Sequence, residues 1–147
     1  MVVLSPRSPL DSLEENNLIV TYCHHEESAA LAGVANSKIT GKPGCVVVTS
    51  GPGCTNAITG LLAAWQDSVP CIFISGQVRS THMSYGMNVR QFGTQEVPII
   101  DIVKPIAKYA KVLEVKDEIL DVLEDALRIS ISGRPGPVWL DIPLDYQ

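Results

Sequence analysis

Two short segments carry the side chains that could do chemistry. The first, Cys-His-His-Glu-Glu-Ser-Ala-Ala at 23–30, places Glu26 at the start of a predicted helix of small residues. The second, Thr-Ser-Gly-Pro-Gly-Cys-Thr-Asn at 49–56, follows an apolar run and predicts a turn that opens another helix. A carboxylate can transfer a proton, and such a turn offers backbone N–H groups and room for a ring or an anion. Together the two segments suggest half of a cofactor site.

Glu26 also has a simpler interpretation. Acidic side chains in the first turn of a helix stabilise its dipole, and Glu27 fits that role equally well. His24 and His25 lack the spacing of an HExxH zinc motif, so we interpret them as structural or as the edge of a pocket. Because ligands of α/β sheets gather at the carboxyl ends of strands, however, Glu26 lies where chemistry is expected.

The turn at 49–56 has two interpretations. Gly51 and Gly53 permit close approach of the backbone and positive φ, and Pro52 stiffens the turn. Thr55 and Asn56 can bond to the helix N-terminus or to a ligand. The segment is not a Walker A loop, and Asn56 replaces the third glycine of a dinucleotide fingerprint. An ordinary strand-to-helix turn remains the alternative.

Further along the chain, residues 76–95 show no regular period and are interpreted as a functional loop. Gln95, followed by Glu96, could place an amide over the mouth of the pocket, although a solvated helix start explains the pair equally well. The small residues of 29–35 favour tight packing against the sheet over contact with a second chain.

These residues must be positioned by the surrounding elements, and strand and helix signals alternate along the chain. Strands are predicted over 18–22, 45–49, 70–75, 107–113 and 138–142, and helices over 10–16, 25–38, 55–66, 97–103 and 116–132. Gly41 is expected to end the second helix. The last helix should face the core with Ile119, Leu120, Leu123, Leu127 and Ile131. The alternation predicts an α/β fold, a parallel sheet with helices on both faces.

The composition excludes several classes of protein. A chain of 147 residues with 46% apolar and 18% charged residues predicts one globular domain. The net charge of −5 and the lack of a basic run argue against nucleic acid as a partner, and no segment has membrane-spanning length. Four widely spaced cysteines indicate a reducing compartment, and we expect no metal site and a cytoplasmic location.

Several motifs, in order, resemble the pyrimidine-binding (N-terminal) domain of thiamine-diphosphate enzymes, most of all the acetolactate synthase group. The motifs lie at 25–30, 41–44, 49–56, 67–70, 74–77, 95–96, 104–106, 133–137 and 141–143, so the resemblance runs from about residue 10 to the end. It implies the thiamine-diphosphate-binding fold, in a single pyrimidine-binding domain over 1–147. It further implies a chain truncated at the N-terminus, without the first strand and its glycine-rich loop.

The resemblance also implies a role for each candidate residue. Glu26 would bond N1′ of the aminopyrimidine and act in catalysis, and Pro52 and Asn56 would line that ring. Gln95 would lie near the reacting carbon. The intact enzyme would decarboxylate a 2-keto acid and transfer the acyl unit to a carbonyl acceptor, as in branched-chain amino acid biosynthesis. Glu27 and Thr94 stand where the family has glutamine and phenylalanine, which leaves the acceptor open.

The remaining partners are implied in the same way. A diphosphate-binding domain or subunit would hold Mg²⁺, FAD binding is left open, and the site would form between two chains of a homo-oligomer. As a fragment, the chain alone is expected to be inactive. Two other functions stay open: a non-catalytic interaction module pairing with a separate diphosphate-domain subunit, and a Rossmann-like nucleotide binder using Gly51 and Gly53.

Overall fold

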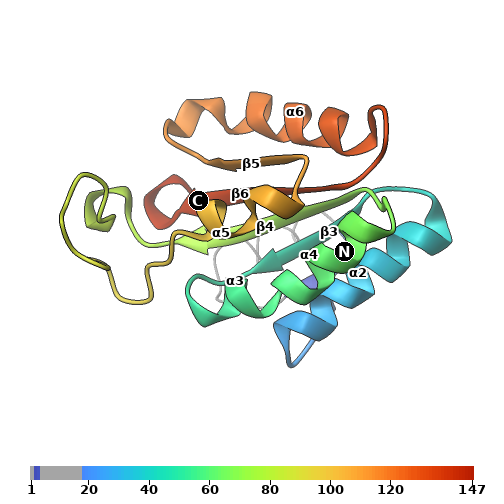
Figure 1. Cartoon of the computed structure of the whole chain (residues 1–147), viewed down its shortest axis with the longest axis horizontal. Helices are drawn as coiled ribbons and strands as arrows, with labels where there is room; N and C mark the ends of the chain where they lie inside the picture. The colour runs from blue at the N-terminus through green and yellow to red at the C-terminus, as the bar shows by residue number, and fades with distance from the viewer. Residues whose placement is uncertain (1, 4–17) are drawn as a thin grey trace.

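The fold is built on a parallel sheet. The computed structural model describes residues 2–3 and 18–147, which form a 6-stranded sheet in the order β2-β1-β3-β4-β6-β5 (Figure 1). The strands are β1 (Val2–Val3), β2 (Thr21–Tyr22), β3 (Gly44–Val48), β4 (Cys71–Gln77), β5 (Tyr109–Val112) and β6 (Pro137–Pro143). All neighbouring strands run parallel. The predicted α/β class is confirmed.

Helices cover both faces of this sheet, as predicted. They are α2 (Glu26–Thr40), α3 (Pro52–Asn56), α4 (Ile58–Gln66), α5 (Ile99–Val103) and α6 (Ile119–Ile131), with short 3₁₀ turns η1 (Ser80–His82), η2 (Lys104–Ile106), η3 (Lys116–Glu118) and η4 (Leu144–Tyr146). Helices α2 and α4 lie on one side of the sheet and α6 on the other (Figure 1). Two separate apolar clusters result, one under α2, α4 and α5 and the other under α6.

Local sequence signals set both ends of α2. His25 is the N-cap, and its Nδ1 accepts a hydrogen bond from the backbone N–H of Glu27 at 3.2 Å. Gly41 ends the helix in the left-handed region, with φ 69°, and its N–H donates to Ser37 O at 2.9 Å. The structural interpretation of His25 is therefore supported, and the predicted stop at Gly41 is confirmed.

Small residues let α2 approach both the sheet and α4. A Cβ atom added to Gly33 would lie 2.4 Å from Val46 Cγ2, and one added to Gly60 would lie 2.4 Å from Ala30 Cβ. Such separations leave no room for a side chain at either glycine. The preferred interpretation of the small-residue helix as a packing surface holds, and that surface also serves α4.

Some helices and strands begin or end at other residues than the sequence predicts. The helix predicted over 55–66 begins at Pro52, which suits the first helical position, and it divides at Ala57 into α3 and α4. The helix predicted over 97–103 begins after Pro98. The strand predicted over 18–22 is limited to its last two residues, whereas the helix end predicted over 10–16 lies outside the described residues.

The prediction for the inner face of α6 was partly wrong. Val122, Ala126 and Ser130 are its buried residues, and they lie one turn apart along the helix. Leu120 is 71% exposed and Leu127 44% exposed. Of the predicted residues, Ile119 and Leu123 pack partly buried against the cluster under α6, whereas Leu120, Leu127 and Ile131 are exposed. The apolar spacing alone could not distinguish these two faces.

Candidate functional site

Glu26 lies at the carboxyl end of β2, as the first residue of α2. The extended backbone of His25, with φ −143° and ψ 138°, turns the chain from strand to helix immediately before it. The Glu26 side chain is half-buried. Its carboxylate therefore stands at the edge of the sheet where α/β folds collect ligands, and it remains open to solvent on one side.

The glycine–proline turn lies directly against this carboxylate. Gly51 has φ 65° and ψ −130°, a conformation that side chains disfavour, and it is followed by Pro52 at the start of α3. A Cβ atom added to Gly53 would lie 2.4 Å from Thr49 Cγ2 and 3.3 Å from Glu26 Oε1. The missing side chain of Gly53 thus makes room for the Thr49 side chain and the Glu26 carboxylate.

Asn56 joins the two predicted segments. Its side-chain Nδ2 donates to Glu26 Oε2 at 3.1 Å, although the residues are 30 positions apart. Among the described residues, no hydrogen bond reaches the second oxygen, Oε1. Asn56 and Pro52 are both exposed. One carboxylate oxygen is held by the protein, while the other lies beside Gly53.

Gln95 reaches the same turn from a distant part of the chain. Its backbone is left-handed, with φ 64°. A Cβ atom added to Gly51 would lie 2.8 Å from Gln95 Cβ and 3.0 Å from Gln95 O. Gly51 is therefore required by the close approach of Gln95 as well as by its own φ. The four candidate residues, Glu26, Pro52, Asn56 and Gln95, border one turn.

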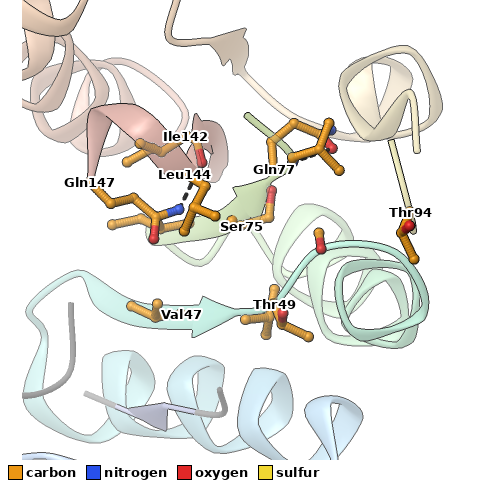
Figure 2. A pocket seen from close by; sticks show the side chains of 13 residues that line it. Val47, Thr49, Ser75, Gln77, Thr94, Ile142, Leu144 and Gln147 are labelled. Carbon is orange, nitrogen blue, oxygen red and sulfur yellow. Dashed lines mark hydrogen bonds between the residues drawn. The ribbon is translucent and has the colours of Figure 1, made fainter. Parts of the chain in front are cut away.

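A cleft of about 280 Å³ opens on the other side of this turn (Figure 2). Val47 and Thr49 line it from the end of β3, Thr94 from the loop before Gln95, and Ile142 from β6. Gln147 closes one wall, where its Nε2 donates to Ile142 O at 2.9 Å. Glu26 and Asn56 are not among its lining residues, so the cleft borders the candidate site without containing the carboxylate.

A buried polar network lies behind the cleft and was missed by the sequence analysis. Asp141 accepts from Ser75 Oγ at 2.5 Å and from Gln77 Nε2 at 2.8 Å, and Trp139 Nε1 donates to Ser75 Oγ at 2.9 Å. Burial raises the pKa of Asp141 to about 7, against the lowering effect of the bonds from Ser75 and Gln77. An aspartate inside the apolar run of β6 was the available signal.

Three of the four cysteines, Cys45, Cys54 and Cys71, do not add a nucleophile to the site. All four are free thiols. Burial raises the pKa of Cys45 to about 11 and that of Cys54 to about 12, and it also raises the pKa of Cys71. A thiol with a raised pKa carries little reactive thiolate at neutral pH.

The described residues hold neither a metal-binding cluster nor a helix that could span a membrane. No group of three or more His, Cys, Asp or Glu side chains in residues 2–3 and 18–147 is arranged to hold a metal ion. Within the same residues, every helix is too short or too polar to cross a bilayer.

The fold and the turn agree with a defined class of protein. Residues 5–103 match the family model for the thiamine pyrophosphate enzyme, N-terminal TPP binding domain, and the chain belongs to this family. It is a thiamine-diphosphate-binding domain. The predicted resemblance is thereby confirmed.

Its relatives show that the domain is of the acetolactate synthase-like type. The chain is 43% identical over 121 residues to the acetolactate synthase large subunit of Haemophilus influenzae, covering 82% of this chain and 20% of that protein. It is 36% identical over 137 residues to the acetolactate synthase isozyme 2 large subunit of Escherichia coli, covering 93% of this chain and 24% of that protein. It is 38% identical over 126 residues to the chloroplastic acetolactate synthase of Arabidopsis thaliana, covering 84% of this chain and 18% of that protein. The chain thus spans about a fifth of the length of these relatives.

Proposed function

We propose that this chain supplies the aminopyrimidine half of a thiamine diphosphate site and that Glu26 is its acid–base group. The observation that carries the proposal is the contact between Asn56 Nδ2 and Glu26 Oε2 at 3.1 Å. Asn56 fixes the direction of the carboxyl group, and Oε1 is left to face a ring nitrogen. In this arrangement Glu26 exchanges a proton with N1′ of the bound aminopyrimidine.

The shape of the site supports this assignment. Gly53 carries no side chain beside Oε1, where a Cβ atom would come within 3.3 Å of the carboxylate oxygen. Pro52 and Asn56 are exposed at the same turn, so an apolar edge and an amide are available to a flat ring. The residues present therefore fit the aminopyrimidine, with Pro52 and Asn56 lining it and Glu26 holding its N1′.

The proposed reaction is that of an acetolactate synthase-like enzyme. Bound thiamine diphosphate would supply the electron sink that permits decarboxylation of a 2-keto acid and transfer of the acyl unit to a carbonyl acceptor. Gln95, held against Gly51, is proposed to lie beside the reacting substrate. The names of the relatives support the reaction class.

The proposal includes a second half-site. A diphosphate-binding domain or subunit would hold the diphosphate and Mg²⁺, and a second copy of the chain would complete the site in a homo-oligomer. Relatives named large subunits, of which this chain spans about a fifth, support a multi-domain assembly. FAD, if it is used, would bind in that assembly.

The arrangement of the glycines does not favour the alternative of a nucleotide binder. At Gly51 the absent side chain makes room for Gln95, and at Gly53 it makes room for Thr49 and Glu26. Both glycines are therefore explained by contacts within the protein, without a phosphate against the backbone.

Replacement of Glu26 by glutamine tests the proposal in the full-length protein that carries this chain. Glu26→Gln keeps the size of the side chain but cannot exchange the proton, so exchange of the cofactor C2 proton and carboligation should fall by about 10²–10⁴-fold. Glu27→Gln is the matched control and should cost little. Normal exchange in Glu26→Gln, or a loss confined to Glu27→Gln, would show that the carboxylate is wrongly assigned.

A further inference from the structure

The loop between β4 and α5 is organised by one carboxylate, that of Glu96. Its Oε1 accepts from Ser84 N at 2.6 Å and from Ser84 Oγ at 2.8 Å. Its Oε2 accepts from Phe92 N at 2.7 Å and from Gly93 N at 3.3 Å. Both oxygens are thus used, and each is used by a different part of the loop.

These contacts differ from those of a solvated helix start, the interpretation that the sequence left open. Helix α5 begins at Ile99, beyond Glu96 and Pro98, so the carboxylate is not in its first turn. Hydrogen bonds to an ionised carboxylate are about twice as strong as those between neutral groups. Although partial burial opposes the shift, the bonds from Phe92, Ser84 and Gly93 lower the pKa of Glu96, so its charge persists.

The base of the loop is fixed independently of Glu96. Asp145 accepts from Ser80 N at 2.8 Å and from Ser80 Oγ at 2.6 Å, which ties η1 to η4. Gly93 packs so closely that a Cβ atom would lie 2.8 Å from Val78 Cγ1 and 2.9 Å from His82 O. Glu96 adds the contact that joins Ser84 to the 92–93 segment.

Gln95 lies between this carboxylate and the glycine–proline turn. It immediately precedes Glu96, it has a left-handed backbone with φ 64°, and its Cβ and O lie against Gly51. A residue other than glycine keeps this conformation only when its surroundings determine it. The bonds of Glu96 hold the chain on one side of Gln95, and the packing of Gly93 holds it on the other.

We propose that Glu96 is a positioning residue, which closes the loop 84–93 through its four hydrogen bonds and thereby holds Gln95 against Gly51. That Gln95 faces a substrate rests on the proposed function; that Glu96 fixes the loop does not. In the assembled enzyme, Glu96 would then affect binding of a 2-keto acid only through Gln95.

Hydrogen exchange tests the contact without any cofactor. In Glu96→Gln one oxygen becomes an NH₂ group, which cannot accept from the N–H groups facing it. The amides on one side of the loop, either Ser84 or the pair Phe92 and Gly93, should therefore exchange about tenfold faster or more, while those of β4 and β6 keep their protection. Glu124→Gln, at an exposed position on α6, is the matched control and should leave all of these rates unchanged. Unchanged protection of the three loop amides in Glu96→Gln would overturn the proposal.

A milder variant covers the case in which Glu96→Gln does not fold. Ser84→Ala removes only the hydroxyl that donates to Oε1, so the three backbone bonds remain. It should accelerate exchange at Phe92 and Gly93 by a smaller factor, in the same direction. Exchange at Phe92 and Gly93 that does not respond to Ser84→Ala would show that the two ends of the loop are not joined through Glu96.

A double-mutant cycle in the full-length protein tests the route through Gln95. Glu96→Gln should raise the KM for the 2-keto acid more than it lowers kcat, and adding it to Gln95→Ala should change KM no further. Additive effects would overturn the positioning role. If the loop amides respond as expected but Glu26→Gln keeps normal C2 proton exchange, the proposed function fails while the structural role of Glu96 stands.

Discussion

The side-chain amide of Asn56 holds Oε2 of Glu26 at 3.1 Å, and so joins the end of α3 to the first residue of α2. The two residues reach each other because α2 and α4 pack closely where Gly60 meets Ala30. The direction of the Glu26 carboxyl group is thus a product of helix packing. Variants of the Asn56 contact and variants of the packing between α2 and α4 should therefore have different effects.

Asn56→Ala should weaken cofactor binding without unfolding the domain. The change removes the donor to Oε2 at an exposed position, and a hydrogen bond to a charged group is worth about 1.5–3 kcal/mol. We therefore expect the Kd for thiamine diphosphate to rise by about tenfold or more, as measured by calorimetry on the full-length protein with Mg²⁺. Asn36→Ala, at an exposed position on α2, should leave it unchanged. An unaltered Kd in Asn56→Ala would argue against the orienting role.

Gly60→Ala should destabilise the domain. The added Cβ atom would lie 2.4 Å from Ala30 Cβ and 2.8 Å from its backbone carbon, so α2 and α4 must move apart. Overpacking of this kind costs about 1–3 kcal/mol, which chemical denaturation would measure. Thr59→Ala, an exposed neighbour on the same helix, is the control. Equal unfolding midpoints for the two variants would mean that this contact is looser than the structure shows.

Gly51→Ala should disturb Gln95 as well as the turn itself. The φ of 65° disfavours a side chain at this position, and the new Cβ atom would come within 2.8 Å of Gln95 Cβ. Stability should fall by about 1–3 kcal/mol, and exchange should accelerate at the amides of Gln95 and Glu96. Gly86→Ala has a similar φ of 76° but no atom within 4 Å of the added Cβ, so it shows the cost of φ alone. Identical effects of the two substitutions would contradict the contact between Gly51 and Gln95.

The pH dependence of stability should reveal Asp141. Burial raises its pKa to about 7 from an ordinary value of 3.8, so the folded state binds the proton more tightly than the unfolded chain does. Its contribution to stability is therefore full below the unfolded pKa and is lost as the pH rises from about 4 to about 7, by at most about 1.4 kcal/mol per pH unit. Urea unfolding at several pH values would measure this slope.

Asp141→Asn removes the titrating group and should remove that part of the slope. Asp121→Asn, at an exposed position on α6, is the matched control and should retain it. A slope between pH 4 and 7 that is the same in the wild-type protein and in Asp141→Asn would show that Asp141 titrates near its ordinary pKa.

The sequence by itself determined those features that depend on neighbouring residues. The bounds of α2 follow from the capping side chain of His25 and the left-handed Gly41. Pro52 favours a helix start, and the apolar runs of β3 and β4 predict strands that are buried in a parallel sheet. Local conformational preferences and periodicity act over a few residues, which is why they can be read along the chain. The order of the motifs was enough to indicate the family.

Only the tertiary structure decided which distant groups meet. The contacts of Asn56 with Glu26 and of Gln95 with Gly51 are fixed by how helices and loops pack on the sheet. The hydrogen bonds from loop amides to the Glu96 carboxylate also depend on groups brought close by the fold. The same is true of the burial of Val122, rather than Leu120, on the inner face of α6. Packing selects among arrangements that local preferences leave nearly equal in free energy, because burial and hydrogen bonding depend on partners that the local sequence does not contain.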